Sequence, residues 1–446
     1  MGLAGPAQRA WALYDFANSV VITTTITAIF PIYFQKVVAG HLSQEVSAQW
    51  FGYSTSLALL AVAVVAPLLG PIADARARRK RYLLWFLAIG AAGAAGLGFV
   101  GAGDVAAALL CFGLVNIGAA GSFVFYDALL PHLAKGDDQD RLSTSGYALG
   151  YVSGAVVLAL QLAWIQHPAA FGLPSGDDLT PSAATLPTRL ALLSAAVWWV
   201  VFSIPLFRRV PEPPPDVASD APIAAAGRSP RALLVAAIAQ VRASWRHLRE
   251  LPDAARMLVA FLVYNDGIVT IIRMATLFGA LLAFETHVLI GAILLVQVVG
   301  IPCALLFGRL ARAIGAKRAV LGGVAAYALI SIAAVAVRTE LHFVALAIAV
   351  GTVQGGTQAL SRSLFASLVP ARRSSEFFAL FAVLEKFAGL LGPALFGLVV
   401  GLAPDPRYGL LAILPMFAIG GYLLFGVDVQ RGRMRALAVD QASLSK

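Results

Sequence analysis

Charged residues and cysteines are scarce in this sequence. Asp, Glu, Lys and Arg make up 13% of the 446 residues, whereas 59% of the residues are hydrophobic. This composition excludes an ordinary soluble globular protein and indicates an integral membrane protein. The two cysteines, Cys111 and Cys303, lie inside apolar runs. We expect them to be unpaired packing residues, because structural disulfides belong to exposed regions in oxidising compartments.

The usual sequence signs of catalysis are also missing. The six histidines show no paired spacing of metal ligands. The chain contains no Gly-Lys-Ser loop of the kind that binds phosphates. We therefore expect no metal, no cofactor and no enzymatic activity, and no transport driven by a nucleotide bound to this chain.

The net charge of +10 does not indicate a nucleic-acid partner. Nucleic-acid binding needs a contiguous basic surface, whereas the lysines and arginines here punctuate apolar runs. That arrangement is typical of membrane proteins, whose cytoplasmic loops are rich in Lys and Arg. The expected partners are the lipid bilayer and a small molecule.

Twelve apolar segments are long enough to span a bilayer, which requires about 20 residues per helix. They are residues 11–38, 50–73, 82–102, 105–130, 144–165, 188–207, 257–282, 287–308, 319–337, 343–368, 376–402 and 408–427. Most of the lysines and arginines fall in alternate loops, on the side that also holds both termini. The sequence therefore predicts a multi-pass protein of the inner membrane with both termini in the cytoplasm.

One long connection divides these spans into six and six. We predict four regions: an N-terminal six-helix bundle at 1–207, a cytoplasmic linker at 208–256, a C-terminal six-helix bundle at 257–430 and a cytoplasmic tail at 431–446. Within the linker, apolar residues recur at helical spacing over 231–250 with arginines beside them. This pattern indicates an amphipathic helix along the inner leaflet; a solvated linker helix is the alternative. Six plus six spans are typical of secondary transporters whose substrate site lies between two related halves.

Internal repetition supports two related halves. Tyr14-Asp15 in the first span is echoed by Tyr264-Asn265-Asp266 in the seventh. The loop after the second span also aligns with the loop after the eighth. One constant offset pairs Gly70 with Gly308 and Arg79-Lys80 with Lys317-Arg318.

The Gly70-x-x-x-Asp74 pattern before a basic cluster resembles the signature loop of the major facilitator superfamily. The segments 11–19 (WALYDFANS), 264–267 (YNDG) and 354–363 (QGGTQALSRS) look like those of its "unknown major facilitator" family, prokaryotic relatives of fungal vacuolar amino-acid effluxers. The resemblance implies an all-α integral membrane protein with the major facilitator fold of two pseudo-symmetric six-helix bundles. It also implies an amino acid or similar metabolite as substrate, and we expect a monomer. Arg312 stands where the second signature loop would carry an acidic residue, so that half of the gate is expected to lock less firmly.

Ionisable and polar groups inside the spans mark the candidate substrate cavity, because such groups are costly in a bilayer. They are Tyr14, Asp15, Asn18, Tyr264, Asn265, Asp266, Arg273, Gln354, Gln358 and Lys386. We predict that Asp266 binds substrate or a proton, with a purely structural ion pair as the alternative. Asp15 shares a helix face with Asn18, and a helix cap is its alternative role. Gln354, Gln358 and Ser361 lie on one polar stripe, which also fits plain interhelical hydrogen bonding.

A second set of residues is predicted to form gating contacts that exist in one access state and break in the other. They are Gly70, Asp74, Arg78, Arg79, Lys80, Asp127 and Arg362. Membrane topology alone also explains the basic residues of the loop, but it does not explain Asp74. For Asp127 the alternative is contact with the substrate, and for Arg362 it is bidentate binding of an anionic group.

The sequence thus favours a secondary transporter of a small polar or zwitterionic metabolite. Coupling to protons is a hypothesis that needs one carboxylate whose pKa is raised by desolvation. Two other functions stay open. A membrane assembly factor would bind a protein partner through the 231–250 helix, and a flippase of lipid-linked or glycan substrates would need a laterally open, apolar-walled cavity.

Overall fold

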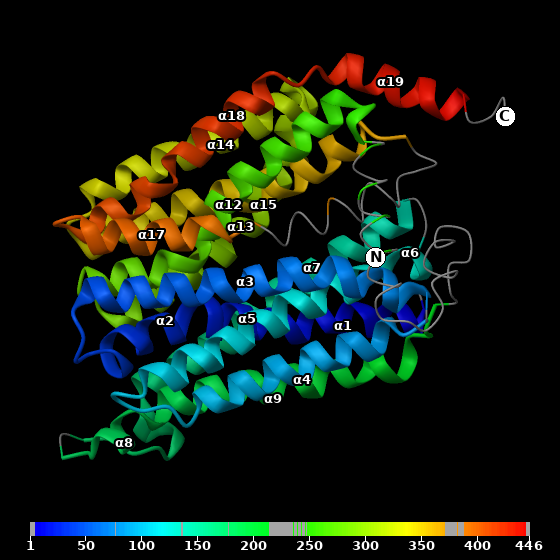
Figure 1. Cartoon of the computed structure of the whole chain (residues 1–446). Coiled ribbons are helices and arrows are strands. Elements are labelled where there is room, and N and C mark those ends of the chain that lie inside the picture. The colour runs from blue at the N-terminus through cyan, green and yellow to red at the C-terminus, as the bar shows by residue number, and fades with distance from the viewer. Residues whose placement is uncertain are drawn as a thin grey trace.

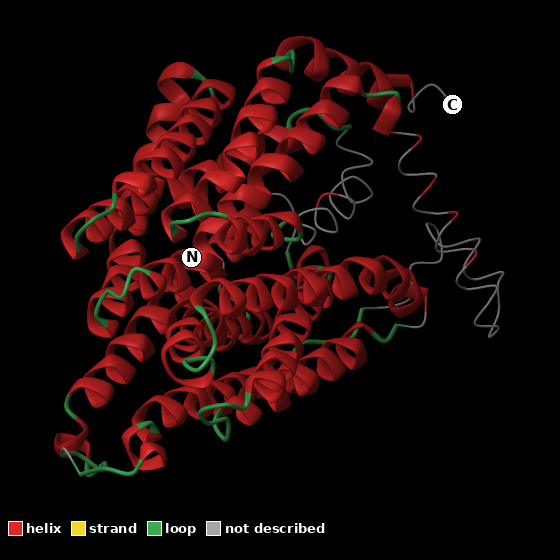
Figure 2. Cartoon of the chain, turned by 60° about the vertical axis from the view of Figure 1, so that its left-hand side comes forward, coloured by secondary structure: helices red, strands yellow, loops and turns green. Residues whose placement is uncertain are grey.

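Helices make up all the regular structure of the described chain. The computed structural model describes residues 5–75, 77–134, 137–176, 178–213, 235, 239, 242, 246, 248–370, 381 and 388–442. Within these ranges there is no strand (Figure 2). Ten helical segments of the described chain are long and apolar enough to cross a membrane. The expected all-helical membrane architecture is therefore confirmed.

The N-terminal half contains the following elements. They are α1 (Pro6–Val21), the π-helix η1 (Ile22–Ala28), α2 (Ile29–Tyr33), the π-helix η2 (Phe34–Val38), α3 (Gln44–Ala75), α4 (Arg79–Leu97), α5 (Val105–Asp127), α6 (Leu130–Leu133), α7 (Asp137–Gln166), the 3₁₀ turn η3 (Pro168–Phe171), α8 (Pro181–Ala184) and α9 (Leu186–Arg209).

The C-terminal half repeats this series with fewer described elements. They are α12 (Pro252–Leu281), α13 (Thr286–Ile314), α14 (Ala316–Ala333), the 3₁₀ turn η4 (Ala334–Ala336), α15 (Glu340–Ala366), α17 (Leu391–Leu402), the 3₁₀ segment η6 (Pro406–Ile413), α18 (Leu414–Phe425) and α19 (Val429–Ala442). Helix α19 is a helical addition at the predicted cytoplasmic tail. Most of the predicted amphipathic helix at 231–250 lies outside the described residues.

Ten of the twelve predicted spans coincide with the long apolar segments. The predicted third span is occupied by α4, which begins with Arg79-Lys80-Arg81. Of the predicted eleventh span, the structure describes only Phe381 and residues 388–402, and the helix α17 begins at Leu391. The total of twelve spans stays a prediction.

The two halves pack their helices in the same way. In the N-terminal half α4 contacts α5 and α9, α3 contacts α5, and α1 contacts α9. In the C-terminal half the equivalent pairs recur: α14 contacts α15 and α18, α13 contacts α15, and α12 contacts α18. Figure 1 shows the two groups of helices one above the other. This shared pattern is the pseudo-symmetry that the internal repeats predicted.

Both termini lie toward one end of the helices (Figure 1). We call this end, where α1 begins and α18 ends, the terminal face. The opposite end, where α8 and the loops at 39–43 and 98–104 lie, is the far face. The positive-inside pattern predicts that the terminal face is cytoplasmic.

The first span changes its winding halfway across. Its threonine-rich segment forms η1, and π-helical turns are uncommon and often occur at functional sites. Pro31 follows and has no N–H to donate to the carbonyl of Thr27, four residues earlier. That carbonyl instead accepts a hydrogen bond from the hydroxyl of Thr276 on α12. The irregular segment therefore joins the two halves.

The described contacts between the halves gather toward the far face. Helix α3 packs on α17, where a Cβ built on Gly397 would come 3.1 Å from the carbonyl oxygen of Ala48. A Cβ on Gly52 would overlap the backbone carbonyl of Pro393. Nearby, the Lys36 ammonium donates to the carbonyl of Phe284 at 2.7 Å. Glycines thus allow backbones of opposite halves to touch at this end.

Candidate functional site

Asp15 forms a buried polar cluster in the N-terminal half. Its side chain is 5% exposed, and Oδ2 accepts a hydrogen bond from the Tyr126 hydroxyl at 2.8 Å. The Tyr126 ring stacks on Trp11 with centroids 4.3 Å apart. Gly146 of α7 lies directly against the carboxylate, since a Cβ there would collide with Oδ2. Asp15 therefore faces the interior of the half between α1, α5 and α7, rather than capping a helix.

Asp266 forms the corresponding cluster in the C-terminal half. Its carboxylate is 5% exposed and accepts three backbone N–H groups, from Gly389 at 2.9 Å, Leu391 at 3.0 Å and Gly392 at 3.1 Å. The first N–H groups of a helix have no partner within the helix. Asp266 supplies that partner for α17 from a different helix, α12. Gly389 has φ +87°, a left-handed conformation that favours glycine and lets the chain turn into α17.

The two clusters are related by the pseudo-symmetry of the halves. In each, the first helix of the half brings a carboxylate against glycines of the fifth span, α7 or α17. The partners differ, because Asp15 accepts from a tyrosine hydroxyl and Asp266 from a helix N-terminus. Asp266 is not paired with Arg273, so the structure contains no ion pair between them.

The polar stripe of α15 faces α12. Tyr264 and Ser361 share a hydrogen bond of 2.5 Å between their hydroxyls, and Gln358 Nε2 donates to Asn265 Oδ1 at 3.3 Å. The spacing in the sequence predicted that these α15 residues share a face, and the structure brings them to the motif of the seventh span. Gln354, one turn earlier, has a buried Oε1 with no hydrogen-bond partner among the described residues.

Arg273 connects the two halves near the middle of the helices. Its Nη1 donates to Oδ1 of Asn116 on α5, and Asn116 Nδ2 in turn donates to the carbonyl of Phe112 at 2.9 Å. Asn116 is fully buried, whereas Arg273 is partly buried. The sequence reasoning missed Asn116 because it searched the spans chiefly for acidic residues.

Several buried polar groups of the first span have no partner within the described chain. The amide of Asn18 and the hydroxyls of Tyr14 and Thr25 are of this kind. Thr24, in contrast, donates to Gln161 Oε1 of α7 at 2.7 Å. The run of threonines was visible in the sequence, and its density within an apolar span was the signal that could have marked it as part of the site.

The basic residues of the signature loop hold the N-terminal half together. Lys80 Nζ donates to the carbonyls of Phe207 at 2.9 Å and Val210 at 2.6 Å, and so caps the end of α9. Arg79 is 4% exposed and lies 3.0 Å from Nε2 of His132. Arg78 is exposed and precedes α4.

In the second loop a lysine also caps a helix end, but its position differs by one residue from the one that the constant offset predicted. Lys317 Nζ donates to the carbonyls of Phe425 at 2.8 Å and Val427 at 2.7 Å at the end of α18. Lys317 is therefore the structural counterpart of Lys80, whereas the constant offset had paired it with Arg79. Three residues separate α3 from α4, whereas one residue separates α13 from α14.

Some predicted site residues cannot be placed by their side chains. Lys386 lies outside the described residues, and Gly70 and Asp74 belong to α3 with side chains outside the description. Asp127 is the last residue of α5, and Arg362 lies on α15. Both have interaction partners.

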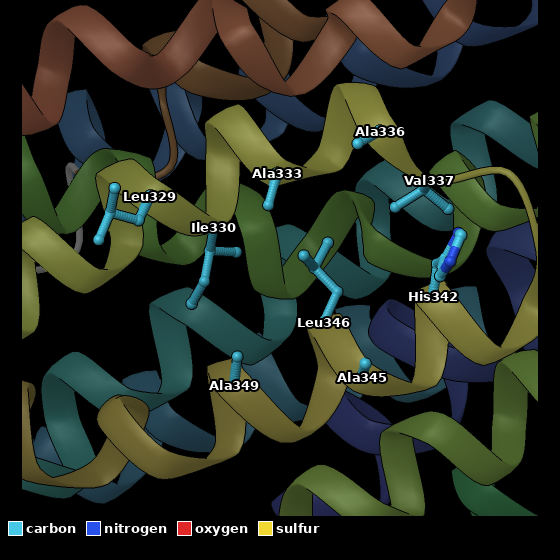
Figure 3. Close-up of a pocket in the computed structure, with 9 residues that line it drawn as sticks. All are labelled: Leu329, Ile330, Ala333, Ala336, Val337, His342, Ala345, Leu346 and Ala349. Carbon is cyan, nitrogen blue, oxygen red and sulfur yellow. The ribbon is translucent and has the colours of Figure 1, made fainter.

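One apolar groove lies apart from these polar clusters. It runs between α14 and α15 toward the far face, has a volume of about 490 Å³, and is lined by alanines and branched aliphatic residues with His342 at one end (Figure 3). Its lining contains none of the predicted site residues.

The chain matches the protein family described as vacuole effluxer Atg22 like over residues 47–437. The uncharacterized MFS-type transporter YxiO of Bacillus subtilis is 29% identical over 418 residues, which are 94% of each chain. Autophagy-related protein 22 of Cryptococcus neoformans is 29% identical over 323 residues, covering 67% of this chain and 52% of the fungal protein. The Saccharomyces cerevisiae protein of that name is 23% identical over 509 residues, covering 97% and 93%.

Solved transporter structures share the fold. A D-xylose-proton symporter has a TM-score of 0.65 at 16% identity and covers 96% of this chain and 98% of its own. A bacterial homologue of the human lysosomal transporter Spinster, in an inward-facing conformation, has a TM-score of 0.63 at 14% identity, with 97% of both chains covered. These likenesses show the fold alone.

Proposed function

The chain belongs to the Atg22-like vacuole effluxer family and has the major facilitator fold, and on that premise we propose that it moves a small polar or zwitterionic metabolite across the inner membrane by alternating access. The intramembrane charges of both signs favour an amino acid or a similar metabolite as the substrate. The function of an MFS-type transporter is established by the relatives; the substrate, the coupling and the access cycle are our proposal.

The observation that carries this proposal is the pair of equivalent acidic clusters. Asp15 and Asp266 are buried carboxylates on the first helix of each half, and each lies against a glycine of the fifth span of its half. Burying each charge costs about 2.5–3.5 kcal/mol on insertion scales. Transporters built from repeats have their substrate and coupling-ion sites at the interface between the repeats, and the first spans of the two halves, which carry these carboxylates, contact each other.

The described contacts between the halves support a state that is closed at the far face. Gly52, Gly397 and Lys36 all lie in contacts at that end. If the terminal face is cytoplasmic, this is an inward-facing state, and rocking of the halves would exchange these contacts for others at the terminal face. We propose that Arg79, Asp127 and Arg362 take part in these contacts at the terminal face.

Coupling to protons is assigned in our proposal to Asp15. The carboxylate of Asp266 is engaged by three N–H donors that complete α17, whereas Asp15 accepts the hydroxyl of Tyr126. A group that binds and releases a proton in each cycle is better placed where its partner can act as donor or acceptor, as a hydroxyl can.

The function is tested with the purified protein in proteoliposomes. A library of labelled metabolites is offered with and without a pH gradient, acid outside. We expect saturable uptake of one small polar class, accelerated by the gradient in the wild type and insensitive to it in Asp15→Asn. Absence of uptake of any solute, together with recovery of a stable protein partner, would favour the assembly factor instead.

Lys36 is expected to hold the far face closed. Lys36→Met removes the donor to the Phe284 carbonyl, a bond near the surface that we expect to contribute about 1 kcal/mol. The far-face-open population should then rise about five-fold, since 1.4 kcal/mol corresponds to a factor of ten. Spin labels on Glu45 and Leu402, exposed residues of the two halves, report this population as a longer distance. An unchanged distance distribution would show that Lys36 is not a latch, and Lys36→Arg serves as the conservative control.

A further inference from the structure

Arg273 is a cation inside the membrane with only a neutral partner. Its described hydrogen bond goes to the amide oxygen of Asn116, and among the described residues it has no ion pair with a carboxylate. A guanidinium offers five N–H donors. One neutral acceptor satisfies few of them, and an unpaired charge in a low-dielectric interior is costly.

The two buried carboxylates of the described clusters, Asp266 and Asp15, are already engaged. Asp266, seven residues earlier on α12, accepts three backbone N–H groups at the start of α17, whose N-terminal dipole favours a negative charge. Asp15 accepts the hydroxyl of Tyr126 and lies against Gly146. Neither carboxylate therefore balances Arg273.

Arg273 lies at a contact between the two halves. Its hydrogen bond crosses from α12 to α5, and one turn further along α12 the hydroxyl of Thr276 also crosses to the first span. Toward the terminal face the same helix carries Asn265 and Tyr264, which contact α15. Along α12, Arg273 thus lies between the contacts that close the far face and the polar residues Tyr264 and Asn265, which are nearer the terminal face.

We propose that Arg273 binds a single anionic group, a carboxylate, of the transported solute, and that the solute needs no ammonium group. This deepens, and rests on, the proposed transport function. Asn116 is the positioning residue that holds the guanidinium when no solute is present. A carboxylate forms a stronger, charge-assisted pair and replaces the amide. Because Asn116 belongs to the other half, that exchange releases one link between the halves as the solute binds.

The solute class is tested with compounds that have the same side chains but differ in whether they carry a carboxylate, an ammonium group or both. The probes are three equimolar pools: free amino acids, their N-acetyl derivatives and their amides. Thermal stabilisation and uptake are measured for each pool. We expect the N-acetyl pool, which carries only a carboxylate, to act at least as well as the free pool, and the amide pool to have no effect. Equal effects of the amides, or a ten-fold advantage of the free amino acids over the N-acetyl pool, would overturn the assignment.

Variants of Asn116 separate recognition from packing. Asn116→Asp supplies a carboxylate beside Arg273 within the protein, and should weaken binding of the N-acetyl pool at least ten-fold without loss of thermal stability. Asn116→Ala removes the competing acceptor and should strengthen binding about three-fold. A purely structural role gives the opposite order, with alanine the more damaging change. Arg273→Gln should abolish binding, and Arg273→Lys should retain part of it, because lysine keeps the charge but loses the bidentate geometry.

The experiments distinguish a failure of this inference from a failure of the proposed transport function. If the wild-type protein moves no solute at all, the proposed function falls and this inference with it. If solutes are transported but uptake ignores both Arg273→Gln and Asn116→Asp, the inference alone is overturned.

Discussion

Replacing Asp266 by alanine is expected to abolish transport and to lower the free energy of unfolding by about 4 kcal/mol. Three backbone N–H groups at the start of α17 lose their acceptor in a buried site. Hydrogen bonds to a charged group contribute about 1.5–3 kcal/mol each, and they do not add fully. Without its cap α17 should also leave its place against α3, the contact that closes the far face.

The measurement combines denaturant unfolding in detergent with uptake in proteoliposomes. Asp266→Asn keeps one acceptor oxygen and should lose about half as much stability. Asp428→Ala is the matched control, since Asp428 accepts a single N–H, that of Arg431, at the exposed start of α19. A loss of about 1 kcal/mol and normal transport are expected there. If Asp266→Ala unfolds like the wild type, the capping role is wrong.

A side chain at Gly52 is expected to prevent closure of the far face and to reduce transport at least ten-fold. The Cβ of Gly52→Val would overlap the carbonyl of Pro393, a backbone atom that cannot move aside without displacing α17. Overpacking of a close contact costs about 1–3 kcal/mol, which shifts a two-state equilibrium by a factor of about 5 to 150. The protein would then rest with the far face open.

The same pair of spin labels, on Glu45 and Leu402, measures this effect directly. The native cysteines are both free, so they are first replaced by serine. Gly291→Val on α13 is the control, because a Cβ there meets no atom within 4 Å. A label distance in Gly52→Val equal to that of the wild type would mean that this contact does not set the access state.

Much of the fold was predictable because apolar length and the placement of cations are local properties of the chain. The positions of ten spans, the division into halves and the motifs at Tyr14 and Tyr264 follow from such patterns. The shared face of Gln358 and Ser361 on α15 follows from helical spacing.

The partners of the charged groups were not predictable in this way. Asp266 is satisfied by backbone N–H groups more than a hundred residues later, and a backbone group leaves no mark in a sequence. The start of α17 inside a predicted continuous span depends on Gly389, one of 41 glycines. Arg273 meets a neutral amide, which a search for opposite charges overlooks.

The lysines of the two signature loops bear on the mechanics of the whole molecule. Lys80 fastens α9 and Lys317 fastens α18, each to a loop of its own half. A rigid rotation of one half against the other leaves such bonds at their full length. In the proposed access cycle we therefore expect each half to move without internal deformation. The few bonds between the halves, such as those of Lys36 and Arg273, are then expected to set the speed of the cycle.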